Sequence, residues 1–216
     1  MAEYSKVAVL QALRSRIHGV ERVECATVLA LPRLHISSSF PEFDGVLPNG
    51  GFPLGSFVEV LCEEGSGGFS LCLKLAREAL ARRSAYAVVD SNRSFYPQAV
   101  AQCGLNLDSL ILIRTEIRRT EWAFIQLLRS SGIGASFLSS RSMDKMAFRR
   151  FQLAAEHGGG LGFVIRPVEA LKQPCWASLR LKVKRVGFGE DCRIRVELLH
   201  VRNGHMDNPI CVDLDA

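Results

Sequence analysis

The sequence predicts an α/β fold with a mostly parallel central sheet covered by helices on both faces. Two observations carry this prediction. Strand-like and helix-like segments alternate regularly through residues 57–165, and a glycine-rich turn follows the first strand. A third, the strict alternation of apolar and basic residues in 178–186, predicts a half-exposed strand in an antiparallel C-terminal meander. Strands that alternate with helices imply right-handed crossovers and parallel pairing.

The expected elements follow one another through short connections. The strands are expected at 57–61, 85–90, 110–114, 135–139 and 161–165. The helices are expected at 67–82, 97–103, 119–129 and 144–157. The tail, with strands at 178–186, 193–199 and 210–214, is expected to form the meander at one edge of the sheet.

The N-terminal part is expected to be an arm outside this core. Residues 5–18 have apolar side chains at the spacing of an amphipathic helix, namely Val7, Leu10, Leu13 and Ile17. Such a helix contacts either its own core or a neighbouring protein. Residues 31–56 are rich in proline and glycine and are expected to be an approach loop that takes no part in the hydrophobic core. The predicted division is 1–35 for the arm and linker and 36–216 for the core.

Composition narrows the classes of function. The net charge of +5, from 27 Lys+Arg and 22 Asp+Glu, is too mild to demand an anionic partner. Seven cysteines form no C-x-x-C pair and are expected to be core residues in a reducing cytoplasm. No histidine and cysteine set has metal-ligand spacing, and no signal peptide or apolar run predicts membrane association.

The turn after the first strand has the frame of a phosphate-binding loop without its chemistry. That loop, G-x-x-x-x-G-K-[ST], needs glycine amides around the phosphates, a lysine to neutralise them and a hydroxyl for Mg²⁺. Here the four defining positions are Cys62, Gly67, Gly68 and Phe69. The degenerate loop comprises Cys62, Glu63, Glu64, Gly65, Ser66, Gly67, Gly68, Phe69 and Ser70. Its two glutamates would repel a triphosphate, although its amides at a helix N-terminus remain an anion site in principle.

Four segments in order resemble the core of RecA-type ATPases, over residues 36–214. They are GGFPLGSFVEV (50–60), VVDSNRSFYP (88–97), QCGLNLDSLIL (102–112) and the tail from LRLKVKRV to ELLHVRNGH. The resemblance implies that the catalytic glutamate of the family falls at Asn92, and that the acid holding Mg²⁺ falls at Ser139 or Ser140. With Gly68 in the lysine position, we expect neither ATP hydrolysis nor a bound cofactor.

The resemblance also bears on DNA binding. The two long loops that bind DNA in recombinases correspond here to the short segments 141–145 and 167–176. A basic row, Arg180, Lys182, Lys184 and Arg185, is expected to be exposed. It would either contact phosphates or serve as a solvated face, so DNA contact is expected to be weak or indirect.

Two further segments, AFRRFQLAAEHGGGLGFVIRP (147–167) and FPEFDGVLPNGGFPLGS (40–56), are similar to the ImuA family of RecA-like accessory proteins of bacterial mutagenesis cassettes. Membership would imply an adaptor role in DNA-damage tolerance, with a polymerase-like protein and RecA as protein partners. The alternatives are a nucleotide- or single-strand-DNA-binding recombinase-like protein and a cell-division inhibitor.

Two expectations concern individual side chains. Trp122 and Trp176 are expected to pack in the core rather than to act as stacking platforms. The helix at 144–157 is expected to bury Phe148, Phe151 and Leu153 on one face and to carry arginines on the other, where a partner contact is conceivable.

Overall fold

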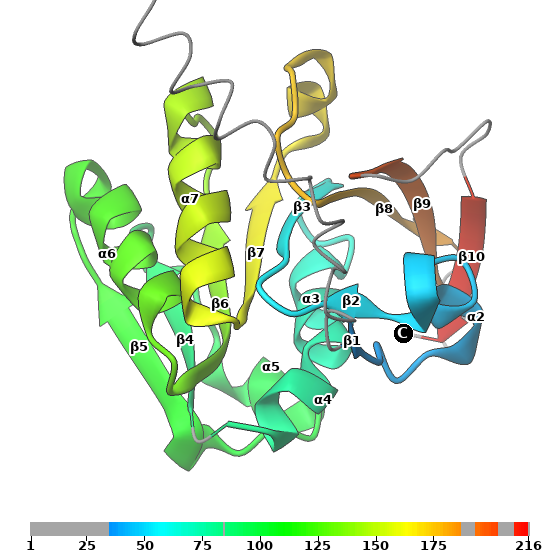
Figure 1. Ribbon diagram of the computed structural model, residues 1–216, viewed down its shortest axis with the longest axis horizontal. Helices are drawn as coiled ribbons and strands as arrows, with labels where there is room; N and C mark the ends of the chain where they lie inside the picture. Colours follow the sequence, from blue (N-terminus) through cyan, green and yellow to red (C-terminus); the bar gives the residue numbers. More distant parts are fainter. Residues whose placement is uncertain (1–34, 84, 187–192, 203–209, 216) are drawn as a thin grey trace, which may run out of the picture. The chain divides into compact units, whose positions relative to one another are not determined.

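The computed structural model describes residues 35–83, 85–186, 193–202 and 210–215 (Figure 1). The strands of its main sheet are β3 (Phe57–Cys62), β4 (Ala85–Asp90), β5 (Leu110–Arg114), β6 (Ile133–Ser139), β7 (Leu161–Arg166), β8 (Leu179–Val186), β9 (Arg193–Val201) and β10 (Ile210–Asp215). Among the described residues they form one sheet in the order β10-β9-β8-β3-β7-β6-β4-β5. Neighbours from β8 to β5 are parallel, and β8, β9 and β10 pair antiparallel. The mostly parallel sheet and the meander at its edge are therefore confirmed.

Helices cover both faces of this sheet, as predicted. They are α3 (Gly68–Leu75), α4 (Arg77–Ala81), α5 (Pro97–Gln102), α6 (Ile117–Arg129) and α7 (Lys145–Gly158). Phe57 packs into the cluster that contains α6 and α7, whereas Val58 packs into the cluster that contains α3 to α5. Successive strand residues point to opposite faces, so the two clusters mark two helical layers. The single helix expected at 67–82 is instead interrupted at Ala76, between α3 and α4.

Residues 35–56, before β3, contribute to the hydrophobic core, so the prediction that this loop takes no part in it is wrong. It contains β1 (His35–Ile36) paired antiparallel with β2 (Phe52–Pro53), the short helix α2 (Pro41–Asp44) and the 3₁₀ turn η1 (Pro48–Gly50). Phe43 and Phe52 are buried, with ring centroids 5.8 Å apart, and Phe52 also packs 6.1 Å from the ring of Phe163. Proline and glycine shape the turns here, while the aromatic side chains between them fill the core.

The expected arm, with Val7, Leu10, Leu13 and Ile17, lies outside the described residues, so the arm and the division near residue 35 stay predictions. Within the described part of the chain, every helix is too short or too polar to cross a membrane.

Candidate functional site

A cleft of about 870 Å³ opens at the carboxyl ends of β3, β4, β6 and β7. Its walls include most of the degenerate loop, the segment after β4 and the residues that follow β6 and β7. Parallel α/β sheets bind their ligands at this end of the strands. The structure thus brings the predicted loop together with Ser139 and Ser140, whereas Asn92 is exposed and outside the lining.

The loop keeps the backbone frame of a phosphate site. Gly65 and Gly67 have positive φ angles of 77° and 83°, which favour glycine. The Ser66 hydroxyl donates a hydrogen bond of 2.7 Å to the carbonyl of Glu63 and so closes the turn. Gly67 then caps the start of α3, so the turn leads directly into the helix.

The lysine position is blocked by the side chain at the first glycine position. Gly68 is buried, and a Cβ atom built on it would lie 2.5 Å from the Sγ atom of Cys62 and 3.0 Å from its Cβ. Cβ atoms do not approach other heavy atoms that closely in proteins, so one of the two side chains would have to shift. The cysteine and the glycine are therefore complementary replacements: the thiol occupies the space that a lysine stem would need.

Phe69 fills the position of the metal-binding hydroxyl. Its ring packs against those of Phe95 and Phe137, with both centroid distances 5.8 Å and tilted or edge-on geometry. Such contacts stabilise an apolar cluster that reaches from α3 to β6. Where a hydroxyl would hold a cation, the cleft has an aromatic wall.

Asp90 is the carboxylate of this site that the sequence analysis missed. It ends β4, is buried, and accepts hydrogen bonds from the backbone amides of Ser94 (3.0 Å) and Phe95 (3.3 Å). Its Oδ2 atom also lies 3.9 Å from Nε of Arg114. The carboxylate therefore holds the loop that carries Phe95. The sequence could have indicated this carboxylate, because an acidic residue directly follows the apolar run AYAVV.

Ser140 is used locally as well. Its amide donates to the carbonyl of Ile165 (3.0 Å), and its hydroxyl donates to the carbonyl of Ser142 (2.8 Å). Neither Ser140 nor Asn92 supplies a carboxylate at the positions where the RecA-type family has acids.

The lining of the cleft carries more carboxylates than arginines. The described carboxylates in the lining are Glu63, Glu64, Asp90 and Glu169, against the two arginines Arg141 and Arg166. Arg141 lies 3.8 Å from Glu64 in an exposed pair, and Arg166 is buried against Glu59. Among the lining residues, neither cation is therefore without a carboxylate partner.

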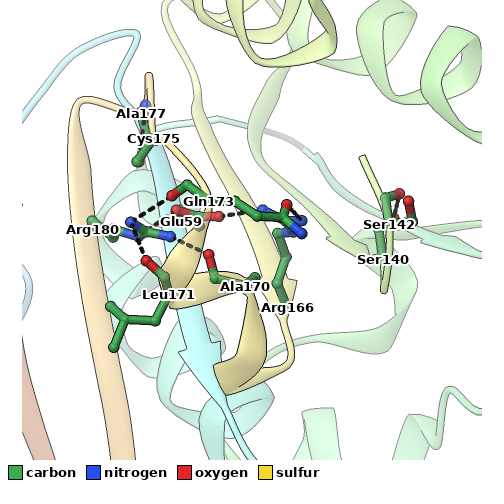
Figure 2. Close-up of polar contacts among 10 residues, drawn as sticks. All are labelled: Glu59, Ser140, Ser142, Arg166, Ala170, Leu171, Gln173, Cys175, Ala177 and Arg180. Carbon is green, nitrogen blue, oxygen red and sulfur yellow. Dashed lines mark hydrogen bonds and ion pairs between the residues drawn. The ribbon is translucent and has the colours of Figure 1, made fainter. Parts of the chain in front are cut away.

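A buried Arg–Glu–Arg cluster lies beside the cleft, whose lining includes one of its members, Arg166 (Figure 2). Glu59 of β3 is fully buried, with Oε1 2.8 Å from Nη1 of Arg166 and Oε2 2.8 Å from Nε of Arg180. The first contact is a hydrogen bond, and the second is an ion pair outside hydrogen-bond alignment. Buried charges are tolerated when they are paired in this way.

The same two arginines fasten the segment between β7 and β8, which contains the 3₁₀ turn η3 (Val168–Lys172). Arg180 donates to the carbonyls of Ala170 (2.7 Å) and Gln173 (3.1 Å), and Arg166 donates to the Gln173 side chain (2.7 Å). Figure 2 shows Glu59 between the two arginines, with the contacts of Arg180 to residues 170–173 beside it. The segment at the place of the second recombinase DNA loop is thus tied to the core.

The prediction that the basic row is exposed is wrong for Arg180, which is buried against Glu59. Lys182 is half-buried, with Nζ 3.0 Å from Oε2 of Glu197 on β9, and Lys184 lies 3.9 Å from the other oxygen of that carboxylate. Lys184 and Arg185 are exposed. Sequence alternation placed all four side chains on the surface because it does not show that Glu59 lies beside Arg180 on the paired strand β3.

Two aromatic predictions are also corrected. Trp122 and Trp176 are 65% and 59% exposed, so neither packs in the core. Leu153 of α7 is exposed too, while Phe148 and Phe151 are buried as expected.

Cys175 gives a pH-dependent prediction for this region. Burial raises the pKa of its thiol to about 12, and the neighbouring Glu59 carboxylate adds to the rise. At pH 8 the native thiol should therefore react with iodoacetamide about three orders of magnitude more slowly than in the unfolded chain, where its pKa is near 8.5. Mass-spectrometric mapping of the Cys175 peptide over pH 7–11 measures this. Alkylation at pH 8 as fast as in urea would contradict it.

Comparison with known proteins identifies the relatives of this chain. No family model matches it. It is 28% identical over 137 residues to the protein ImuA of Caulobacter vibrioides, a match that covers 60% of this chain and 56% of the relative. It is also 29% identical over 106 residues to RecA of Rickettsia africae, which covers 49% of this chain and 31% of that protein. The chain is thus similar in sequence to ImuA and RecA proteins.

RecA of Chlorobaculum parvum shows the same relationship, with 30% identity over 97 residues, 45% of this chain and 28% of the relative. The match spans little more than half the length of the ImuA proteins. The resemblance to ImuA and RecA inferred from the sequence motifs is confirmed, and the sheet described above has the α/β architecture expected from it.

Proposed function

We propose that this chain is a non-catalytic RecA-like accessory protein in DNA-damage-induced translesion synthesis, in which it acts as a protein–protein adaptor. The main support for the absence of catalysis is the close approach of Cys62 to any side chain at position 68. A lysine stem at 68 has no room beside the Cys62 thiol, and no other described lysine lines the cleft. Phosphoryl transfer depends on cations around the transferred phosphate.

The role in mutagenesis is supported by the similarity to ImuA, together with the motifs that resemble that family. Its protein partners in the proposal are a polymerase-like protein of an error-prone polymerase complex and RecA. DNA contact is indirect or weak in this proposal, because Arg180 is buried and Lys182 is paired with Glu197. The protein would act in the bacterial cytoplasm without ATP.

Two measurements test the proposal. With the purified chain in excess over ATP, hydrolysis in a single turnover should not exceed that in buffer, whereas an active RecA in the same assay hydrolyses ATP. In the source bacterium, deletion of the gene should lower the frequency of mutations induced by DNA damage. The wild-type gene and an Asn92→Ala/Ser140→Ala variant should restore it equally, since neither side chain serves catalysis.

Hydrolysis clearly above buffer would overturn the non-catalytic part. An unchanged frequency of induced mutations would overturn the role in mutagenesis. If deletion instead removed a damage-induced arrest of cell division, the result would favour the cell-division inhibitor.

A further inference from the structure

The outer side of α6 and α7 carries large apolar side chains that the core does not use. Ile117 and Trp122 on α6 are 78% and 65% exposed, and Met146 and Leu153 on α7 are 63% and 49% exposed. Met146 and Leu153 are two turns apart and therefore lie on one side of their helix. The inner sides of both helices are already filled by Phe124, Phe148, Phe151 and neighbouring residues.

This pair of helices forms a prearranged surface. α6 and α7 pack side by side (Figure 1), and the rings of Phe124 and Phe151 meet edge-on with centroids 4.9 Å apart. On the solvent side, Nη2 of Arg150 lies 3.7 Å from Oε2 of Glu121 and joins the two helices. A partner that binds here would not have to order the helices first, which lowers the entropic cost of association.

The charge of this surface is positive. Five arginines of α6 and α7 are exposed, of which Arg118 pairs with Glu116 (2.6 Å) and Arg150 with Glu121. The other three have no ion-pair partner among the described residues of the chain, namely Arg119, Arg129 and Arg149. These three arginines therefore leave positive charge on this surface that would complement an acidic partner.

We propose that this α6–α7 surface docks an acidic amphipathic segment of a partner protein. Exposed Trp, Met and Arg side chains are the types enriched at the centres of protein–protein interfaces. Nucleic acid fits less well, because Trp122 is the one ring among the four exposed apolar side chains, and Ile117, Met146 and Leu153 offer none on which further bases could stack. The inference rests on the adaptor function proposed above, and names the surface and the chemistry through which it would operate.

Three labelled helical peptides test this proposal by fluorescence anisotropy with the full purified chain. They share one leucine stripe and carry glutamate, glutamine or lysine at the other positions. The glutamate peptide should bind most tightly and the lysine peptide least. Trp122→Ala, and separately Arg119→Glu with Arg149→Glu, should weaken binding of the glutamate peptide about tenfold or more.

Matched controls are available on the same chain. Trp176→Ala removes an equally exposed tryptophan from the segment after β7, and Arg82→Glu reverses an exposed arginine after α4, in the opposite helical layer. Both should leave peptide binding unchanged, and circular dichroism should show all variants folded.

Failure of the glutamate peptide to bind, equal binding of the glutamate and lysine peptides, or equal losses in the control variants would each overturn the proposal. So would an oligothymidine that binds the chain and is released by the same α6–α7 substitutions, since the surface would then belong to nucleic acid. The assay contains neither ATP nor damaged DNA. Its outcome is therefore separate from those of the hydrolysis and mutation-frequency measurements.

Discussion

Replacing Glu59 with glutamine is expected to lower the free energy of unfolding by about 3–5 kcal/mol, the range for breaking a buried ion pair by removing one partner. The change leaves the guanidinium groups of Arg166 and Arg180 inside the protein without a counter-charge. Both lose a negative charge at 2.8 Å, and each keeps its hydrogen bond to a neutral group of residues 170–173. Urea denaturation followed by circular dichroism measures the loss.

Glu197→Gln is the matched control for this prediction. It removes a partly exposed carboxylate from Lys182 and Lys184 on the neighbouring strand β8, and should cost about 1 kcal/mol or less. A triple variant with Glu59→Leu, Arg166→Met and Arg180→Met removes all three charges together and should recover much of the loss. Equal, small effects of the Glu59 and Glu197 substitutions would refute the importance of the cluster.

Gly68→Ala should destabilise the protein by about 1–3 kcal/mol, the usual cost of forcing an extra group into a packed site. The new methyl group would lie 2.5 Å from the Cys62 sulfur. In the background Cys62→Gly the sulfur is gone, and the same substitution should cost much less. The coupling free energy in a double-mutant cycle should be about 1–2 kcal/mol.

Gly132→Ala controls for the general effect of adding a methyl group, because its nearest neighbour would be the Ser130 hydroxyl at 3.9 Å. It should change stability by less than about 0.5 kcal/mol. Additive effects at positions 62 and 68 would show that the thiol does not fill the lysine position. Even the pair Cys62→Gly and Gly68→Lys should not hydrolyse ATP, since Phe69, Asn92 and Ser140 stay unchanged.

The sequence was most informative about the central strands. β4 and β5 have the predicted bounds. The buried strand β4 and the edge strand β5 are both apolar runs, and a charged residue marks the end of each. It was misleading for Phe43 and Phe52, whose neighbouring prolines and glycines resemble those of a surface loop. The sequence also placed Trp122 in the core, because neighbouring residues do not distinguish an exposed tryptophan from a buried one.

For the site, the replaced positions of the phosphate loop were readable from spacing alone, since that motif is local. The contact between Cys62 and Gly68 follows from the way the turn brings residues six apart together. The pairing of Glu59 with Arg166 depends on side chains 107 residues apart that meet only after the strands are ordered. Arg180 is buried because it pairs with the same Glu59 across neighbouring strands, and the alternation of residues along one strand cannot predict such a pairing.

The fastening of η3 by Arg166 and Arg180 has a consequence for how such a protein would be controlled. In a switch, a ligand acts by favouring one of two arrangements of a mobile element. Here the element beside the cleft is held by the protein's own buried charges, whatever the cleft contains. If the chain is the adaptor proposed above, the amount of its complex is expected to follow the cellular concentrations of the components rather than a nucleotide cycle.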